Sequence, residues 1–153
     1  MGTKGLGQRM ERIEDCVSFL LGKAFQKVSR QAREALAAHG VTPVQYATLN
    51  VLWQGDGLSC SDLCARLVLD SATMTGIVDR LEAAGHVARR PDPEGDRRVN
   101  RIYLTAAGHD LRAPLDAIMA GVNRDVDALL GDASANFRAA LARLADVAEP
   151  SPN

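Results

Sequence analysis

Apolar side chains recur at helical spacing along most of the chain, in six segments separated by glycine, proline and other turn-forming residues. The spacing i, i+3, i+4, i+7 is clearest at four neighbouring positions, Met74, Ile77, Val78 and Leu81. It predicts a helix over 71–84 with one buried face, and Asp70 and Gly85 are suitable residues to begin and end that helix. The same periodicity predicts helices over 13–39, 43–55, 60–67, 105–130 and 133–148.

Two of these helices carry a clear start signal, and one contains a proline. Thr42 with Gln45 fits a capping box, and Ser59 with Asp62 supports the start of the next helix. Pro114 lies inside the predicted 105–130 helix and should bend it, because a proline nitrogen cannot donate a backbone hydrogen bond.

The pattern changes to alternation after the 71–84 helix. Residues 87–91 and 97–104 are predicted to form two strands, and the residues between them are typical of a turn. Leu58 is expected to add a minimal third strand. The product is a β-hairpin with arginines at its tip, placed directly after a helix.

The exposed face of the 71–84 helix carries very little side-chain bulk. Its members fall within about one quadrant of a helical wheel: Ala72, Thr75, Gly76, Asp79 and Ala83. Glycine inside a helix costs about 1 kcal/mol relative to alanine, so this face suggests the close approach of a large object such as the major groove of B-DNA. A tight crossing with another helix is the alternative. The hairpin that follows favours DNA, because a recognition helix followed by such a hairpin is typical of a winged helix-turn-helix.

Three motifs resemble the MarR family of transcriptional regulators. Asp70-Ser71 opens the helix, Asp79-Arg80-Leu81-Glu82-x-x-Gly85 closes it, and Asp96-Arg97-Arg98 leads through the hairpin to Leu104-Thr105. The similarity covers most of the chain, from residue 13 to residue 147.

The resemblance implies a mainly α-helical (α+β) winged helix-turn-helix with about six helices and a small β-wing, which forms a homodimer and binds double-stranded DNA. A single domain over 1–153 is expected. Residues 42–104 would form its DNA-binding lobe, and residues 13–40 and 105–148 its dimerisation helices. A helical bundle that folds back within one chain is the alternative to dimerisation.

Ten residues are predicted to contact DNA: Ser59, Ser71, Ala72, Thr73, Thr75, Gly76, Arg80, Asp96, Arg97 and Arg98. The small residues between Ala72 and Gly76 are expected at base edges, since threonine hydroxyl and methyl groups suit several bases. The two serines lie near helix N-termini, where free N–H groups favour phosphate oxygens. Arg80 is expected at a phosphate or a guanine edge, or in a salt bridge within the domain.

The wing carries the remaining predicted contacts. The resemblance implies that Arg98 lies in or over the minor groove, with Asp96 orienting it and Arg97 adding charge. Asp79 is expected to pair with a wing arginine rather than to read cytosine, which would tie the helix to the wing.

The composition is ordinary for a soluble globular protein, with 46% hydrophobic residues, 24% charged residues and a net charge of −1. The charges are unevenly distributed. Residues 1–40 carry seven Lys and Arg against four acidic residues, residues 86–104 five against three, and residues 105–153 four against seven. The acidic end would therefore lie away from DNA, and the few basic contacts predict modest, salt-sensitive binding.

Several classes of function are disfavoured. No signal peptide and no membrane-length apolar run is visible, so a cytoplasmic protein without a membrane partner is expected. Cys16, Cys60 and Cys64 are unpatterned, which argues against a disulfide framework. The three histidines are scattered, without the spacing of a nucleophile and its base. The sequence predicts neither an enzyme nor a protein with a metal or other cofactor.

The resemblance further implies control by a small molecule. The expected function is that of a repressor, which a small aromatic or anionic effector releases from a pseudo-palindromic operator with half-sites roughly 10 bp apart. The residues expected to line the effector cleft are Phe25, Trp53, Arg112 and Met119.

Two alternative functions remain open. Cys16 resembles the reactive cysteine of the organic-hydroperoxide-sensing branch of the family, although Gln31 and Thr42 stand where that branch has two tyrosines that activate the thiol. A buried, inert thiol is the other interpretation of Cys16. A winged helix that binds proteins instead of DNA is the second alternative, and the arginines at the wing tip argue against it.

Overall fold

Seven α-helices and a three-stranded antiparallel sheet make up the part of the chain that the computed structural model describes, residues 12–95 and 98–145. The helices are α1 (Val17–Leu36), α2 (Pro43–Gln54), α3 (Cys60–Leu67), α4 (Ser71–Ala83), α5 (Ala106–Asp110), α6 (Arg112–Leu130) and α7 (Ser134–Leu144). The strands are β1 (Leu58–Ser59), β2 (Val87–Pro91) and β3 (Asn100–Leu104), in the order β1-β3-β2. The predicted mainly α-helical winged helix is confirmed, including the minimal third strand at Leu58.

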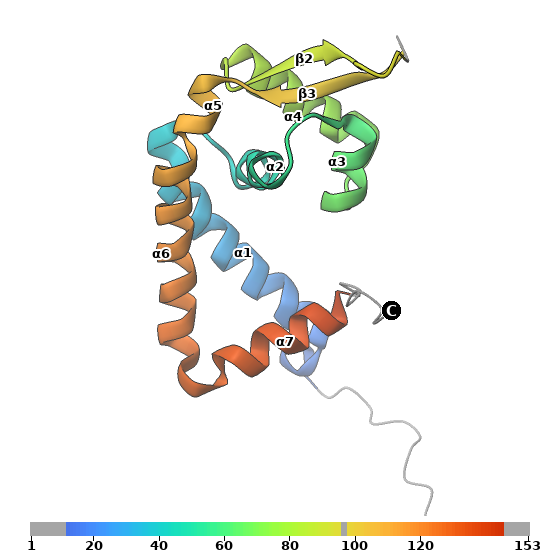
Figure 1. Ribbon diagram of the computed structural model, residues 1–153. Coiled ribbons are helices and arrows are strands. Elements are labelled where there is room, and N and C mark those ends of the chain that lie inside the picture. The colour runs from blue at the N-terminus through green and yellow to red at the C-terminus, as the bar shows by residue number, and fades with distance from the viewer. Residues whose placement is uncertain (1–11, 96–97, 146–153) are drawn as a thin grey trace, which may run out of the picture.

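The elements form two parts that meet at α2 (Figure 1). β2 and β3 lie on the outer side of α2, α3 and α4, whereas α1, α6 and α7 extend away from them. α2 belongs to both parts, because it contacts α3, α4 and β3 and also α1 and α6. No helix within the described residues combines the length and the apolar character needed to cross a lipid bilayer.

The buried side chains lie where the apolar spacing predicted them. The four periodic residues of α4 have at most 2% of their surface exposed, and they share one core with Leu49 of α2, Leu63 of α3 and Ile102 of β3. This burial removes one face of α4 from water and leaves the opposite face outside the core.

Side-chain caps fix where two of the predicted helices begin. The Thr42 hydroxyl accepts from the Gln45 N–H (3.3 Å), and the Gln45 amide oxygen accepts from the Thr42 N–H (2.9 Å). The Asp70 carboxylate accepts from the Thr73 N–H (2.8 Å) at the start of α4. Each cap supplies a partner to a backbone donor that the helix itself cannot satisfy, so both predicted starts are confirmed.

The first predicted helix is wrong at its N-terminal end. Cys16 has extended backbone angles (φ −78°, ψ 118°) and separates a short 3-10 turn (Ile13–Asp15) from α1. Its N–H donates to the Ile13 carbonyl (3.0 Å), while its own carbonyl accepts from Leu20 (2.9 Å). Cys16 is therefore the N-cap of α1 and not part of its interior. Gly40, with φ 64°, ends this region as predicted.

The predicted helix over 105–130 consists of two helices, α5 and α6, divided at Leu111. Pro114 explains the division, because its ring in a continuous helix would collide with the carbonyl of Asp110. The proline instead lies in the first turn of α6, where a missing N–H leaves no helical hydrogen bond unmade. The expected bend is thus a break, and the described residues contain seven α-helices where about six were expected.

Two other predicted boundaries are wrong. β3 begins at Asn100 and not at residue 97, because Arg98 still belongs to the turn. α7 ends at Leu144, before the predicted end at residue 148. Residues 146–153 lie outside the described part of the chain.

The helices away from the sheet leave large apolar side chains in solvent. Val17 is 62% exposed, Phe25 and Leu129 are each 72% exposed, and Leu144 is 62% exposed. An open cavity of about 480 Å³ lies between α1, α6 and α7, and Phe25 and Phe137 contribute to its walls. A single chain therefore buries Leu115 and Val122 of α6 but leaves several other apolar positions of α1, α6 and α7 exposed.

Candidate nucleic-acid interface

α4 presents its side-chain-poor face to solvent. Ala72, Thr73 and Thr75 are exposed, and a Cβ atom placed on Gly76 would come within 4 Å of no neighbouring element. The tight helix crossing considered for Gly76 is therefore wrong. The backbone of α4 is open to a large ligand along this face.

Two exposed threonine hydroxyls of α4 already donate a hydrogen bond within the protein. The Thr75 hydroxyl donates to the Ser71 carbonyl (2.8 Å), and the Thr73 hydroxyl donates to the Asp70 carboxylate (2.7 Å). The hydroxyl and the N–H of Thr73 hold the pKa of the Asp70 carboxyl below its ordinary value. Each threonine oxygen can still accept a hydrogen bond, and each methyl group can contact a thymine methyl.

The two serines predicted at phosphates differ in their local contacts. Ser71 is exposed in the first turn of α4. Ser59 is half-buried, and its hydroxyl both donates to the Asp62 carboxylate (2.7 Å) and accepts from the Asp62 N–H (3.1 Å). The hydroxyl of Ser59, followed by its N–H (2.9 Å), donates to the Asp62 carboxylate and lowers the pKa of Asp62. An ionised carboxylate beside Ser59 repels phosphate, so this contact has less support than the one at Ser71.

Arg89 of β2 ties the wing to α4. Its guanidinium forms ion pairs with Asp79 (2.5 Å) and with Glu82, and its N–H donates to the Glu82 carboxylate (3.0 Å). The Arg89 N–H, followed by its guanidinium, lowers the pKa of Glu82. The predicted pairing of Asp79 with a wing arginine is confirmed. The sequence reasoning did not identify Glu82, although its position three residues after Asp79 places both carboxylates on one side of the helix.

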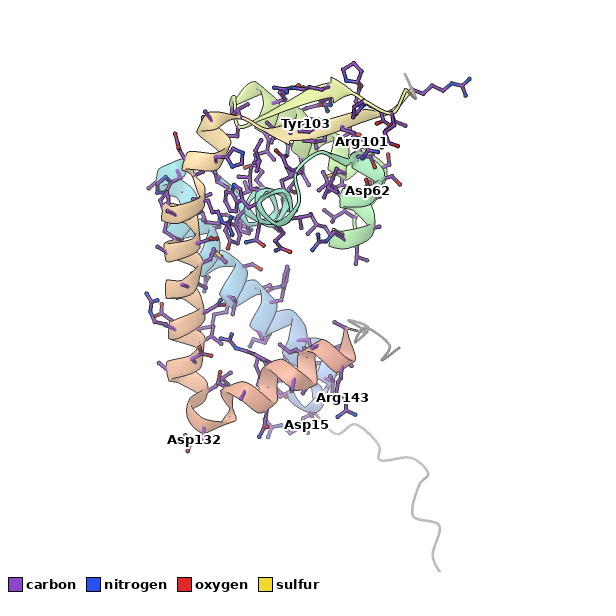
Figure 2. The ribbon with its side chains drawn as sticks, in the orientation of Figure 1. Asp15, Asp62, Arg101, Tyr103, Asp132 and Arg143 are labelled. Carbon is purple, nitrogen blue, oxygen red and sulfur yellow. The ribbon has the colours of Figure 1, made fainter. Side chains whose placement is uncertain are left out.

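The opposite face of the wing carries a second group of arginines. Arg90 stacks over the ring of Tyr103 (5.4 Å), and Arg101 forms an ion pair with Asp92 (3.0 Å) and donates to the Gly57 carbonyl (3.1 Å). Figure 2 shows Arg101 and Tyr103 on the wing and Asp62 on α3 below them. Arg101 and Tyr103 were absent from the predicted site, but their alternation with Ile102 places them on the outer face of the sheet.

The arginine at the end of the wing is exposed. Arg98 lies in the turn between β2 and β3, where the sequence predicted the wing-tip arginine. Asp96 and Arg97, predicted to orient Arg98 and to add charge, lie outside the described residues. Their roles stay predictions.

Arg80 lies exposed near the C-terminal end of α4. None of the ion pairs found within residues 12–95 and 98–145 includes Arg80. The alternative of a salt bridge within the domain is therefore not observed in the described part of the chain, and a phosphate or base contact stays the prediction.

The four predicted effector residues lie on three helices, α1, α2 and α6. Phe25 lines the open cavity between α1, α6 and α7. Trp53 packs edge-on against Tyr46 (6.1 Å) and donates to the Gly108 carbonyl (3.1 Å), while Arg112 pairs with Asp116 (3.7 Å). Met119 is half-buried against the core. Three of the four thus lie on α2 and α6, and Phe25 lies elsewhere.

The three cysteines are free thiols. The Cys16 thiol forms a hydrogen bond with the Ser18 hydroxyl (3.1 Å), and this bond lowers the pKa of Cys16. Burial raises the pKa of Cys60. The two residues that stand in place of the activating tyrosines have other partners: Gln31 donates a hydrogen bond to Asp125 (2.5 Å), and Thr42 caps α2.

The described residues contain no group of three or more His, Cys, Asp or Glu side chains placed to hold a metal ion.

Comparison with known proteins identifies the family. A model of the MarR family matches residues 39–98. The HTH-type transcriptional regulator TtmR of Methylorubrum extorquens is 35% identical over 150 residues, which are 94% of this chain and 76% of that protein. The chain belongs to the MarR family. Members of this family are DNA-binding transcriptional regulators and not enzymes.

Two other proteins extend this similarity to the MarR family. The HTH-type transcriptional repressor NicR of Pseudomonas putida is 32% identical, over 84% of this chain and 79% of its own length. The crystal structure of CouR from Rhodococcus jostii RHA1, bound to p-coumaroyl-CoA, has a TM-score of 0.78 and 26% identity, over 92% of this chain and 99% of CouR.

Replacement of Arg89 by methionine tests whether the position of the wing depends on the ion pairs of Arg89 with Asp79 and Glu82. The variant removes both ion pairs but keeps an unbranched side chain. We expect the affinity for DNA to fall by about tenfold, because the wing loses its fixed place beside α4. Fluorescence-anisotropy titration at fixed salt, with DNA retained by the unmodified protein, measures the change. Arg124→Met removes one positive charge from α6 and is the control; an equal loss there would attribute the effect to net charge.

Proposed function

We propose that this MarR-family regulator binds a pseudo-palindromic DNA site as a homodimer and represses transcription until a small effector releases it. The observation that carries the proposal is the open, side-chain-poor face of α4 around Gly76, beside a wing that Arg89 fixes in place. A helix with so little bulk can approach base edges closely in the major groove.

The wing supplies contacts of a different kind. Arg98 is exposed at the hairpin turn, and a guanidinium there suits the negative potential of the minor groove or a phosphate. Such contacts depend little on base sequence, whereas the threonines of α4 would discriminate between bases. Specificity is therefore assigned to α4 and general affinity to the wing.

The exposed apolar surface of α1, α6 and α7 supports dimerisation. A contiguous apolar surface of this kind on a soluble protein is typical of a protein–protein interface. A second copy of the same helices would fill the cavity lined by Phe25 and Phe137. Twofold symmetry would then present two α4 helices to half-sites roughly one helical turn apart.

Effector binding and repression are each supported by one relative. CouR was solved with an aromatic thioester bound, and NicR is named a repressor. An aromatic or anionic effector that binds better to a conformation with a different spacing of the two α4 helices would shift the protein away from DNA.

Peroxide sensing through Cys16 is the second candidate function. The Ser18 hydrogen bond lowers the pKa of this thiol, so more of it is thiolate at neutral pH than in an ordinary cysteine. Thiolate attack on an organic hydroperoxide would break the O–O bond and leave a sulfenic acid and an alcohol.

Gly76→Leu and Arg98→Ala test the assignment of specificity and affinity. A Cβ atom at residue 76 meets no neighbouring element, and the higher helix propensity of leucine should raise the free energy of unfolding by about 0.8 kcal/mol. The same side chain should obstruct the major groove and weaken binding to the selected DNA by more than about tenfold. Arg98→Ala should instead weaken binding to selected and scrambled duplexes alike.

Denaturant unfolding and titrations on both duplexes provide the two measurements. A Gly76→Leu variant that is more stable and still binds DNA like the unmodified protein would contradict the assignment of base recognition to α4. Absence of DNA binding by the unmodified protein would favour the protein-interaction module instead.

Phe25→Asp tests dimerisation. A carboxylate at this exposed apolar position should be strongly unfavourable within a helix–helix interface. Sedimentation velocity should show a dimer for the unmodified protein and a shift toward monomer for the variant. Val68→Asn is the control, since Val68 is 90% exposed and precedes α4. If Phe25→Asp sediments like the control, the interface lies elsewhere.

Cys16→Ser tests peroxide sensing. A lowered pKa predicts that the thiolate fraction, and hence the rate of reaction with cumene hydroperoxide, rises with pH and levels off below the pH typical of a free cysteine. The hydroperoxide should release the unmodified protein and Cys60→Ser from selected DNA but not Cys16→Ser. Equal release of all three proteins would exclude a role for Cys16.

A further inference from the structure

Tyr46 of α2 makes a directional contact with α6. Its hydroxyl donates a hydrogen bond to the Asp116 carboxylate at 3.0 Å. No other side-chain hydrogen bond within the described residues joins α2 to α6. The remaining contacts between these helices are packing contacts, which are much less directional.

Neighbouring side chains hold both partners of this bond. The Asn50 amide donates to the Tyr46 hydroxyl (3.4 Å), and the second carboxylate oxygen of Asp116 faces Arg112 (3.7 Å). The Tyr46 ring packs edge-on against Trp53 (6.1 Å). Burial, together with the hydrogen bond to Asp116, raises the pKa of Tyr46 to about 12, so the phenol keeps its proton at neutral pH.

α2 is also the helix that carries the DNA-binding elements. It packs against α3, α4 and β3, and Leu49 and Leu52 of α2 lie in the same buried core as the apolar face of α4. A rotation of α2 on α6 would therefore move α4 with it. In a dimer joined through α1, α6 and α7, the same rotation would change the separation of the two α4 helices.

We propose that the Tyr46–Asp116 hydrogen bond is a positioning contact that fixes α2 on α6 and thereby sets the half-site spacing that the dimer accepts. The inference rests on the proposed function as a dimeric DNA-binding regulator. Tyr46 and Asp116 act through the orientation of α4, and neither is assigned a contact with DNA.

Tyr46→Phe removes the hydroxyl and keeps the ring. The DNA probes are the duplex that the unmodified protein selects from a random library, the same duplex with one or two base pairs added or removed between the half-sites, and a duplex with a single half-site. We expect Tyr46→Phe to bind the single half-site unchanged, but to lose about three- to tenfold of its preference for the selected spacing.

Three further variants separate the hydrogen bond from other effects. Asp116→Leu removes the acceptor and should behave like Tyr46→Phe. Asp116→Asn keeps an acceptor oxygen for Tyr46 but loses the charge that faces Arg112, and should retain the original spacing preference. Thr48→Val deletes a buried hydroxyl that bonds only within α2, to the Val44 carbonyl (2.9 Å), and is the matched control.

The outcomes distinguish this inference from the proposed function. If the unmodified protein selects no paired half-sites, the proposed function fails. If it does select them, an unchanged spacing profile in Tyr46→Phe and Asp116→Leu overturns the positioning role alone. An equal change in Thr48→Val would overturn it as well, because the effect would then follow from general loss of stability.

Discussion

The guanidinium of Arg89 joins the two elements that would meet DNA. It lies between Asp79 and Glu82 of α4, while its own strand continues toward the wing turn that carries Arg98. Charge-assisted bonds of this kind are directional, so the hairpin is held in one orientation to the helix. The apolar face of α4 is buried on the other side of the same helix. α4 is thus fixed by protein on two sides and left open around Gly76.

Apolar side chains lie in two settings, a buried core and an exposed helical surface. α2, α3, α4 and the sheet share one core inside the chain, as expected for a winged helix that must hold its recognition helix rigidly. α1, α6 and α7 keep much of their apolar surface outside that core, and the cavity among them is open. The core of this lobe also takes in Leu36 at the end of α1 and Leu115 of α6, and a second copy would cover the rest of the apolar surface of these helices in the proposed dimer. α2 connects the winged lobe to α1 and α6, so the orientation of α2 on α6 would determine the spacing of the two lobes in a dimer.

The sequence was sufficient for features that depend on nearby residues. The capping boxes at Thr42 and Ser59 join residues three apart, and the apolar spacing of α4 spans two turns, so local geometry decides both. The small residues around Gly76 and the arginines of the hairpin indicated the candidate site for the same reason. The break at Leu111 was not predicted, because the spacing of apolar residues does not show the steric effect of Pro114 on the preceding turn.

Only the tertiary structure decided which distant residues meet. Sequence reasoning expected a wing arginine beside Asp79, but strand register determined that this residue is Arg89 and that Glu82 joins it. The Tyr46–Asp116 bond spans 70 positions, and Phe25 lines the cavity between α1, α6 and α7 whereas Trp53, Arg112 and Met119 do not. Periodicity states which face of a helix is apolar, but not which partner covers it. That choice depends on how all the elements pack together, and no local pattern contains it.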